Sequence, residues 1–391
     1  MPPDVSIPPQ KTETVTAGIT TRVNAPVVEK LAIIGLGLIG GSLGLALLQR
    51  GLAREVTGYD RDPATIEEAF SLGAINRRAS SLEEAVEHAG IVILAVPVGS
   101  LSQVARSIAA CLAPGTIVTD TGSVKGAVVR ELESILPPGV FYVGGHPMAG
   151  SERAGIKAAD CYLLENAFYV LTPTPATDRG ALQRLEVLFQ AMGARVMPLD
   201  AEEHDLVVAG ISHLPHLLAV SLMQAAGKLA QEHPLTLMLA AGGFRDTTRI
   251  AAGEPALWRD IFLHNRQAIL TLLKSWRLQV EALEEMILQS DGDNLEAALQ
   301  QACRLRSQVP ARQKGLLPDL HELVVTVPDR PGVIGAMATA LGNAGINIID
   351  IEILRVREGE GGSIRLGFTT AAAAAAALEV LQGRGISARM L

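Results

Sequence analysis

The stretch that decides the fold is residues 31–41, LAIIGLGLIGG. Its first four residues are apolar and predict a buried β-strand, and its glycines follow the spacing Gly-x-Gly-x-x-Gly. In a strand–turn–helix unit, the first glycine permits a tight turn, the second lets the backbone approach a pyrophosphate, and the third lets the helix pack closely on the strand. We therefore expect a dinucleotide to bind at the start of the helix, where free amides attract phosphate. The expected contacts are Gly35, Gly37, Leu38, Ile39 and Gly40.

An acidic residue, Asp60, stands at the end of the next predicted strand, about 20 residues after the glycines. A carboxylate at this place accepts hydrogen bonds from the 2′-hydroxyl of the ribose and repels a 2′-phosphate. The expected cofactor is therefore NAD. Arg61 leaves NADP open, because an arginine beside the acid can accommodate the extra phosphate.

Outward from this stretch, short β-type runs alternate with segments of helical period up to about residue 200. The runs are near-continuously apolar, which is typical of parallel strands that are buried on both faces. We predict a Rossmann-type doubly wound parallel sheet in an α/β domain. The strand-like runs are residues 31–35, 56–59, 91–96, 116–119, 140–143, 167–171 and 195–197.

The chain changes character twice after this domain. Helical periodicity follows, with breaks near His233–Pro234 and Gly253–Pro255, and its apolar residues 206–226 predict a buried helix pair. The last segment has the order βαββαβ, which is typical of a ferredoxin-like domain. The predicted organisation is a disordered tail at 1–28, a dinucleotide-binding domain at 29–200, a helical domain at 201–306, a linker at 307–319 and a small βαββαβ domain at 320–391.

Composition excludes several classes of protein. Aromatic residues make up 3% of the chain and the net charge is −8, so neither stacking platforms nor a basic field for nucleic acid are expected. The three cysteines are far apart and odd in number, which indicates a reducing compartment, and we expect a cytoplasmic protein. The apolar segment 31–48 contains the fingerprint glycines, so no membrane span is expected.

Some polar residues are interpreted as structural. His213 and His216 lie at helical spacing but lack a third ligand, so no metal site is expected. His204 and Asp205 are explained equally well as the cap of a helix. Trp258 is interpreted as a packing residue.

Polar or glycine-rich segments follow three of the predicted strands, and ligands of open α/β sheets bind at this edge. The first segment is Val96-Pro97, which we expect to contact the cofactor. Another contains His146, between two glycines and a proline. An imidazole, with an ordinary pKa of about 6.5, suits proton transfer, so His146 is the candidate general base.

Four motifs together resemble the prephenate/arogenate dehydrogenase family. They are GLGLIGGS from Gly35, TDTGSVK from Thr119, GGHPMAGSE from Gly144 and SHLPH from Ser212. The resemblance covers roughly residues 31–304, and the combination is far more specific than any one motif. In the last domain, DRPGV from Asp329 and GINI from Gly345 resemble an ACT domain, a ligand-binding regulatory module.

The resemblance implies a reaction. Prephenate, or alternatively arogenate, would lose a hydride to NAD and its ring carboxylate as carbon dioxide, and prephenate would give 4-hydroxyphenylpyruvate in tyrosine biosynthesis. His146 would accept the proton of the ring hydroxyl, and Ser123 would hydrogen-bond near both.

Residues of the helical domain would then bind the substrate. Arginine can hold a carboxylate through two parallel hydrogen bonds, which makes Arg249 the first candidate and Arg245 the second. Ser212 and His216 are four residues apart, so one helix face could carry both to the substrate.

The ACT resemblance implies an amino-acid ligand, with tyrosine as feedback inhibitor, and the apolar helical domain implies a homodimer. The expected regulatory contacts are Asp329, Gly332, Asn347 and Ile348.

Other functions remain open at this point. A non-catalytic NAD-binding sensor of amino acids would not need a base and an anion-binding arginine together. Dehydrogenases of the hydroxyacid type usually place a catalytic lysine in the helical domain, and the SHLPH region has none. A serine hydrolase is disfavoured because Ser123 lacks the Gly-x-Ser-x-Gly pattern.

Overall fold

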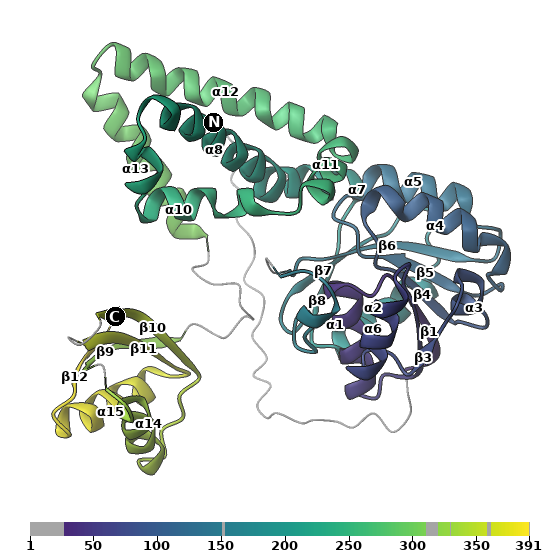
Figure 1. The fold of residues 1–391 in the computed structure, drawn as a ribbon, viewed down its shortest axis with the longest axis horizontal. Coiled ribbons are helices and arrows are strands. Elements are labelled where there is room, and N and C mark those ends of the chain that lie inside the picture. The colour runs from purple at the N-terminus through teal and green to yellow at the C-terminus, as the bar shows by residue number, and fades with distance from the viewer. Residues whose placement is uncertain (1–26, 151–152, 310–319, 329, 358–360, 391) are drawn as a thin grey trace. The chain divides into compact units, whose positions relative to one another are not determined.

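The computed structural model describes residues 27–150, 153–309, 320–328, 330–357 and 361–390. The chain forms two compact units, which divide between Pro310 and Ala311 (Figure 1). Most of the predicted tail and most of the predicted linker lie outside the described residues.

The first unit contains an eight-stranded sheet in the order β3-β2-β1-β4-β5-β6-β7-β8, and the predicted Rossmann-type class is confirmed. The strand order reverses between β1 and β4, so the crevice for a ligand opens beyond the carboxyl ends of these two strands. The strands are β1 (Val28–Ile34), β2 (Ala53–Tyr59), β3 (Arg77–Arg78), β4 (Ile91–Leu94), β5 (Ile117–Asp120), β6 (Phe141–Pro147), β7 (Phe168–Thr172) and β8 (Arg195–Pro198).

One strand pair departs from the predicted parallel sheet, because β7 runs antiparallel to β6. Among the described residues between them, the chain forms only a short 3₁₀ helix, Ile156–Ala158, which is too short for the crossover that a parallel pair needs. The carboxyl half of β6 therefore pairs with a returning strand, and His146 lies opposite Val170.

Helices cover both faces of this sheet (Figure 1). On one face are α1 (Leu38–Gln49), α2 (Pro63–Ser71) and α6 (Arg179–Ala191), and on the other are α3 (Leu82–Val86), α4 (Leu101–Ile108) and α5 (Gly126–Ile135). The core strands are almost fully buried, as their apolar runs predict.

The predicted all-helical domain follows, and its breaks at His233–Pro234 and Gly253–Pro255 are confirmed. Its elements are α7 (Ala201–Val208), a π-helical turn (Ala209–His213), α8 (Leu214–Glu232), α9 (Leu235–Met238), α10 (Gly242–Thr248), a 3₁₀ turn (Arg249–Ala252), α11 (Pro255–His264), α12 (Arg266–Leu288) and α13 (Gly292–Gln308).

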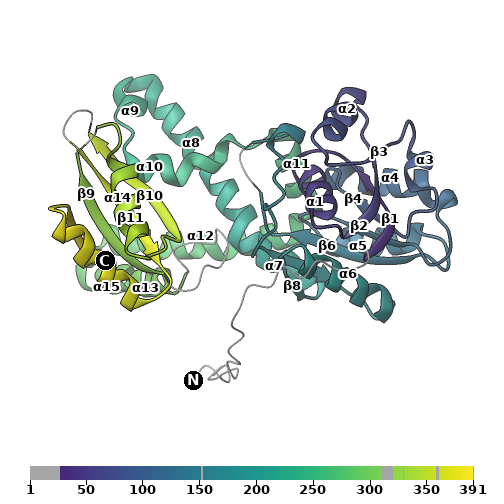
Figure 2. The ribbon, with the colours of Figure 1, turned by 90° about the horizontal axis from the view of Figure 1, so that it is seen from below.

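The predicted buried helix pair at residues 206–226 is wrong. Residues Ala201–Glu232 form one continuous helical stretch that is long and apolar enough to cross a membrane, yet only 33% of its most apolar window is buried. Its π-helical turn contacts α12, Figures 1 and 2 show the two helices from two sides, and both leave large apolar side chains exposed. The helical period of the sequence indicates that the helix has an apolar face, but it does not show what covers that face. Within one chain, no other described element covers the apolar face of this helix.

The second unit has the predicted βαββαβ order. Its four strands form an antiparallel sheet in the order β10-β11-β9-β12, and the alanine-rich segment is helix α15, capped by Thr370. Both helices pack on one face of the sheet around a separate apolar core. The elements are β9 (His321–Val327), α14 (Val333–Asn343), β10 (Asp350–Arg357), β11 (Gly361–Phe368), α15 (Ala371–Gly383) and β12 (Ser387–Met390).

Gly44→Ala tests the close packing of α1. A Cβ at Gly44 would lie 1.9 Å from the carbonyl oxygen of Ala74, and backbone cannot yield as a flexible side chain can. We expect a loss of about 1–3 kcal/mol in the free energy of unfolding, measured by thermal or denaturant unfolding. At Gly90 a Cβ would meet only the oxygen of Lys30 at 3.7 Å, so Gly90→Ala is the matched control, and equal losses in both variants would contradict this account.

Candidate active site

The three fingerprint glycines have different surroundings. Gly35 has a φ of +94°, and a Cβ there would lie 2.4 Å from the oxygen of Ala95. A Cβ at Gly40 would lie 2.0 Å from the oxygen of Gly35, whereas none of the described atoms lies within 4 Å of the Cβ position of Gly37. Two of the glycines are thus required by the protein itself, and the third leaves open space for a ligand.

The start of α1 fits a dinucleotide. No described side chain caps this helix terminus, and its first turn contains no acidic residue, so the amides of Leu38 and Ile39 remain available to phosphate. The Asp60 carboxylate is held at the end of β2, where it accepts hydrogen bonds from the amides of Leu36 (2.9 Å) and Asp62 (3.0 Å). Each oxygen of this carboxylate keeps accepting capacity for a ribose hydroxyl.

His146 lies at the carboxyl end of β6 and hydrogen-bonds residues of the helical domain. Its Nδ1 is 2.8 Å from Nε2 of His204, whose Nδ1 is in turn 2.9 Å from Oδ1 of Asp205. His204 and Asp205 are buried, and His146 is partly exposed. We call these three residues the His–His–Asp network.

The Asp205 carboxylate also caps α5, a helix that begins about 80 residues earlier in the chain. Its two oxygens accept hydrogen bonds from the amides of Lys125 (2.7 Å) and Gly126 (2.8 Å). Amides at a helix N-terminus carry partial positive charge, so they attract a carboxylate at this place.

The ionised carboxylate determines the tautomers of both histidines. Asp205 can only accept, so Nδ1 of His204 donates to it and Nε2 of His204 carries a lone pair. Nδ1 of His146 must then donate to that lone pair, which leaves the lone pair of His146 on Nε2. Among the described residues Nε2 of His146 has no partner, so it is the atom available to accept a proton from a ligand.

The pKa of the His146 imidazole lies well below its ordinary value of 6.5. Burial is the main cause, and Coulombic interactions with the nearby His204, Lys125 and His213 lower it further. His146 is therefore neutral at pH 7, which is the protonation state of a general base.

A buried ion pair fixes the peptide before His146. Nζ of Lys125 hydrogen-bonds the carboxylate of Asp120 and donates to the carbonyl oxygen of Gly145 at 2.8 Å. The other oxygen of Asp120 accepts from the Gly145 amide (3.2 Å) and the Tyr142 hydroxyl (2.8 Å). Both sides of the Gly145 residue are thus bonded to one fully buried pair.

His216 and Trp258 form a second feature of the helical domain. Their rings stack with centroids 3.5 Å apart, and Nδ1 of His216 is buried with no hydrogen-bond partner among the described residues. A Cβ at Gly253 would lie 2.4 Å from Nε1 of Trp258, so glycine is needed for this packing. An unpartnered buried nitrogen is costly unless a ligand or water bonds it, which suits a binding residue.

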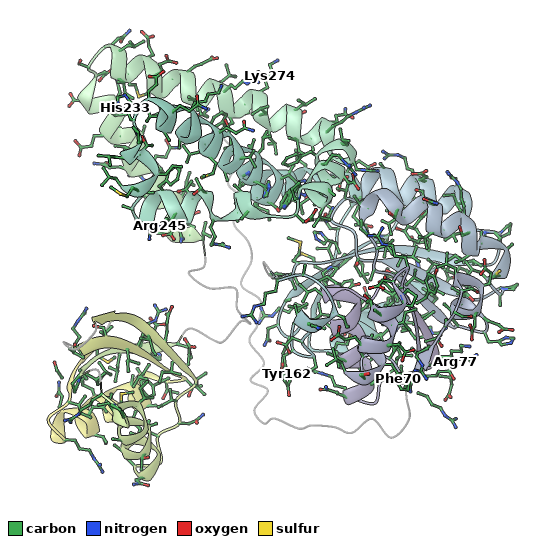
Figure 3. All side chains as sticks on the ribbon, in the orientation of Figure 1. Phe70, Arg77, Tyr162, His233, Arg245 and Lys274 are labelled. Atoms are coloured by element: carbon green, nitrogen blue, oxygen red, sulfur yellow. The ribbon has the colours of Figure 1, made fainter. Side chains whose placement is uncertain are left out.

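Other predicted substrate contacts are not joined to this network by any described hydrogen bond. Ser123 and Ser212 are partly buried, whereas Arg249 is exposed. Arg245 lies exposed on α10 (Figure 3). Val96 and Pro97 follow β4 at the switch point of the sheet.

In the second unit, Gly332 has a φ of +86° at the start of α14, Asn347 is exposed, and Ile348 packs against the core. Asp329 lies outside the described residues.

Sequence reasoning missed the partners of His146. His204 and Asp205 do not cap the start of their own helix, because Asp200 caps α7 through the amides of Glu202 and Glu203, whereas Asp205 caps α5. An available signal was the position of His204, one turn inside a helix rather than before it. Lys125 and Asp120 belong to the TDTGSVK motif, but the sequence predicts no role for them, because their burial follows only from the fold.

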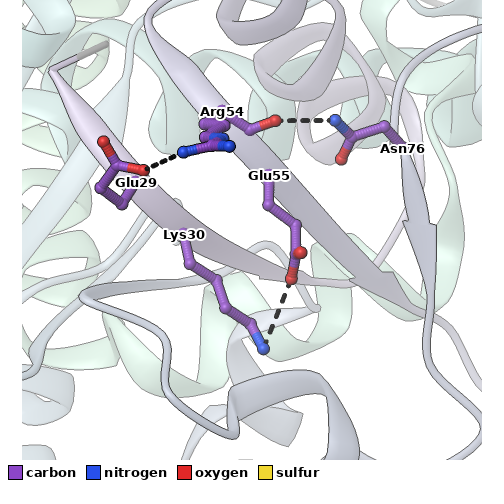
Figure 4. Close-up of a pocket in the computed structure, with 5 residues that line it drawn as sticks. All are labelled: Glu29, Lys30, Arg54, Glu55 and Asn76. Atoms are coloured by element: carbon purple, nitrogen blue, oxygen red, sulfur yellow. Dashed lines mark hydrogen bonds and ion pairs between the residues drawn. The ribbon is translucent and has the colours of Figure 1, made fainter.

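Two hollows of the described surface lie away from this network. One is lined by Glu29, Lys30, Arg54, Glu55 and Asn76 at the amino ends of β1 and β2, and ion pairs cross it (Figure 4). Ligands of such sheets bind at the opposite edge, so we assign this hollow no catalytic role. No group of three potential metal ligands occurs among the residues that the structure describes.

Comparison with known proteins assigns the chain to a family. Three family models match in order: the nucleotide-binding domain of prephenate dehydrogenase at residues 43–198, its dimerization domain at 200–301, and the ACT domain at 321–386. A prephenate dehydrogenase of Bacillus subtilis is 39% identical over 341 residues, which cover 87% of this chain and 92% of that protein. The chain belongs to the prephenate dehydrogenase family.

Two further members bear on cofactor and substrate. The cyclohexadienyl dehydrogenase of Zymomonas mobilis is 36% identical over 69% of this chain and 92% of its own length. The crystal structure of the Aquifex aeolicus prephenate dehydrogenase in complex with hydroxyphenyl propionate and NAD⁺ has a TM-score of 0.69 and 32% identity, and covers 72% of this chain and 98% of that chain. The resemblance drawn from the motifs is thus confirmed, including the ACT domain.

Gly37→Ala and Gly40→Ala should separate ligand binding from folding in this member of the family. We expect Gly37→Ala to keep the melting temperature within about 2 °C but to raise the Kd for NAD⁺ at least about tenfold, because the new methyl occupies only ligand space. Gly40→Ala should lower the melting temperature instead. Calorimetric titration and thermal unfolding measure the two effects, and unchanged NAD⁺ binding by Gly37→Ala would contradict the proposed contact.

Proposed function

We propose that this protein is an NAD-dependent prephenate dehydrogenase that converts prephenate to 4-hydroxyphenylpyruvate and carbon dioxide. The observation that carries the proposal is the His–His–Asp network, which leaves a neutral base at the sheet edge where the fingerprint glycines also lie. Family membership supplies the substrate class, because the Bacillus subtilis relative is a prephenate dehydrogenase.

The reaction requires a proton acceptor and a hydride acceptor at one carbon. NAD⁺ held at the start of α1 and near Gly37 would supply the acceptor for the hydride of ring atom C4. Nε2 of His146 takes the proton of the C4 hydroxyl, so that a carbonyl forms there as the hydride leaves. Loss of the ring carboxylate as carbon dioxide then aromatises the ring to a phenolate, which recovers the proton from His146. The base therefore has to be unprotonated before the reaction, as the lowered pKa of His146 ensures.

The His–His–Asp network stabilises the charge that this transfer creates. When Nε2 of His146 takes up a proton, the ring becomes cationic and Nδ1 remains bonded to His204. The Asp205 carboxylate lies one residue further along the network and offsets that charge electrostatically. His204 and Asp205 thus orient the base in the correct tautomer.

Binding of the two substrate carboxylates is assigned to the helical domain. Arg249 is the first candidate, because a guanidinium can bond a carboxylate bidentately, and Arg245 is the second. His216 contributes through its unpartnered Nδ1, and Ser212 through its hydroxyl. Ser123, in the loop after β5, is assigned to hydrogen-bond the C4 hydroxyl.

The alternative substrate is arogenate, which carries an amino group where prephenate carries a keto oxygen. The cyclohexadienyl dehydrogenase among the relatives keeps this alternative open. A sensor without catalysis is less well supported, since it would not need a base whose tautomer is set by two further buried residues.

A homodimer accounts for the exposed apolar faces of the helical domain. Leu222 and Leu229 on α8, with Leu270 and Leu278 on α12, are each at least 40% exposed within one chain. Large apolar side chains exposed in this number often mark an interaction site, and the matching family model describes a dimerization domain.

The cytoplasm is the proposed compartment. Cys111, Cys161 and Cys303 are all free thiols, and two of them are exposed. Exposed thiols of this kind persist where the surroundings are reducing.

The first experiment follows NADH absorbance with purified full-length protein, NAD⁺ and prephenate, with arogenate and NADP⁺ in parallel. Turnover of prephenate with NAD⁺ is the expected result. If arogenate alone is turned over, the proposed mechanism stands and the substrate is arogenate. If folded protein that binds NAD⁺ produces no NADH with either substrate, the enzymatic assignment is wrong.

His146→Asn should lower kcat by about 10²–10⁴-fold and leave the Kd for NAD⁺ nearly unchanged, because only proton transfer loses its base. His88→Asn is the matched control, since His88 is highly exposed and lies outside the network. An unaltered kcat in the His146 variant would transfer the base to another residue.

The pH dependence of kcat/KM tests the state of His146. The base is active when unprotonated, and a lowered pKa keeps it unprotonated in weakly acidic solution, so activity should be flat through pH 6.5 and fall only at lower pH. An acid limb centred at or above pH 6.5 would contradict the assignment.

Regulation by tyrosine is proposed for the second unit. Full-length protein should be inhibited by tyrosine, and a chain that ends at Val309 should keep its activity but lose the inhibition, because the two units are separate folding bodies. Phenylalanine serves as the comparison ligand. Inhibition that survives the truncation would place the tyrosine site elsewhere.

A further inference from the structure

Asn265 lies between α11 and α12, at the N-terminus of α12, but its side chain does not cap that helix. Asparagine is among the preferred N-cap residues, because its side chain accepts a hydrogen bond from the first turn of the helix. The side chain of Asn265 makes no such bond to α12. It is 4% exposed and turns instead toward α7 and the π-helical turn.

Both hydrogens of the Asn265 side-chain amide form hydrogen bonds. Nδ2 donates to the backbone oxygen of Asp205 at 2.8 Å and lies 3.0 Å from Nδ1 of His213. A carbonyl oxygen can only accept, so the atom that faces it is the amide nitrogen, not the amide oxygen. The second N–H then donates to Nδ1 of His213, and the proton of that imidazole is on Nε2.

His213 sits in the π-helical turn, a local widening that is frequent at functional sites. Its ring is 1% exposed and meets Trp258 edge to face, with centroids 6.2 Å apart. Burial lowers its pKa to about 4, so the ring is neutral at pH 7 and has a defined tautomer. Among the described residues, Nε2 of His213 has no hydrogen-bond partner.

We propose that Asn265 is a positioning residue, which holds His213 in the Nε2–H tautomer so that His213 donates a hydrogen bond to an oxygen of the bound substrate. The proposal rests on the proposed dehydrogenase function and deepens it. His146 and His213 then present opposite groups: a lone pair that accepts the substrate proton, and an N–H that binds a carboxylate, keto or hydroxyl oxygen. Asn265 also joins the two, since it bonds the backbone of Asp205 in the His–His–Asp network.

The first test needs no activity. Full-length protein with ¹⁵N-labelled histidine gives a tautomer-specific pattern of ring nitrogen shifts, and the signal of His213 is identified by its absence from His213→Gln. The Nε2–H pattern is expected at pH 7 in the wild type. The Nδ1–H pattern would overturn the proposal, whether or not the protein oxidises prephenate.

Asn265→Asp tests whether the tautomer of His213 affects substrate binding and turnover. This near-isosteric change replaces the amide donor by an acceptor, so Nδ1 of His213 should become protonated and Nε2 should lose its hydrogen. We expect kcat/KM for prephenate to fall by about 10–100-fold, which corresponds to the loss of one hydrogen bond to a carboxylate of the substrate, with NAD⁺ binding unchanged. A wild-type kcat/KM, or a His213 that keeps its Nε2–H pattern in this variant, would overturn the proposal.

A double-mutant cycle separates the tautomer from a structural role. Glutamine at position 213 can still donate through its amide, and it has no tautomer for Asn265 to set. Asn265→Asp should therefore cost little in the His213→Gln background, within about twofold. An equal loss in both backgrounds would show that Asn265 acts through the fold of the π-helical turn and not through His213. If Asn265→Asp does not fold, Asn265→Ser, which can donate one hydrogen bond, is compared in the same cycle.

Discussion

The carboxylate of Asp205 is the group on which the site depends. It belongs to the helical domain, yet it caps α5 of the sheet domain through the amides of Lys125 and Gly126 and also accepts from His204. One buried carboxylate thus connects the two domains and sets the tautomers of two histidines. Without it, α5 would keep two unsatisfied amides and His146 would have no defined proton-accepting atom.

Two further constraints place His146. The Lys125–Asp120 pair bonds both the amide and the carbonyl of Gly145, and the antiparallel return of β7 pairs with His146 itself. Removal of one member of a buried ion pair leaves the other charge uncompensated, which is strongly destabilising. The backbone that carries the base is therefore rigid, while its imidazole is adjusted by hydrogen bonds from another domain.

The helical domain has a polar end and an apolar end. Its residues near the sheet are buried and polar, including His204, His213, His216 and Asn265, whereas the distal parts of α8 and α12 expose apolar side chains. The domain thus combines a polar end that completes the site with an apolar surface suited to association. The second unit has its own core, which is consistent with a regulatory module that folds independently.

The sequence by itself determined the Rossmann-type class, the helical and βαββαβ domains, the cofactor fingerprint and His146 as the candidate base, because local spacing and hydrophobic period report these directly. Only the tertiary structure decided which residues act on that base. His204 and Asp205 lie about 60 residues from His146, and Asn265 about as far again, so no local pattern relates them. Their roles follow from burial and hydrogen-bond direction, and both properties arise when the α7 end of the helical domain packs against the carboxyl edge of the sheet.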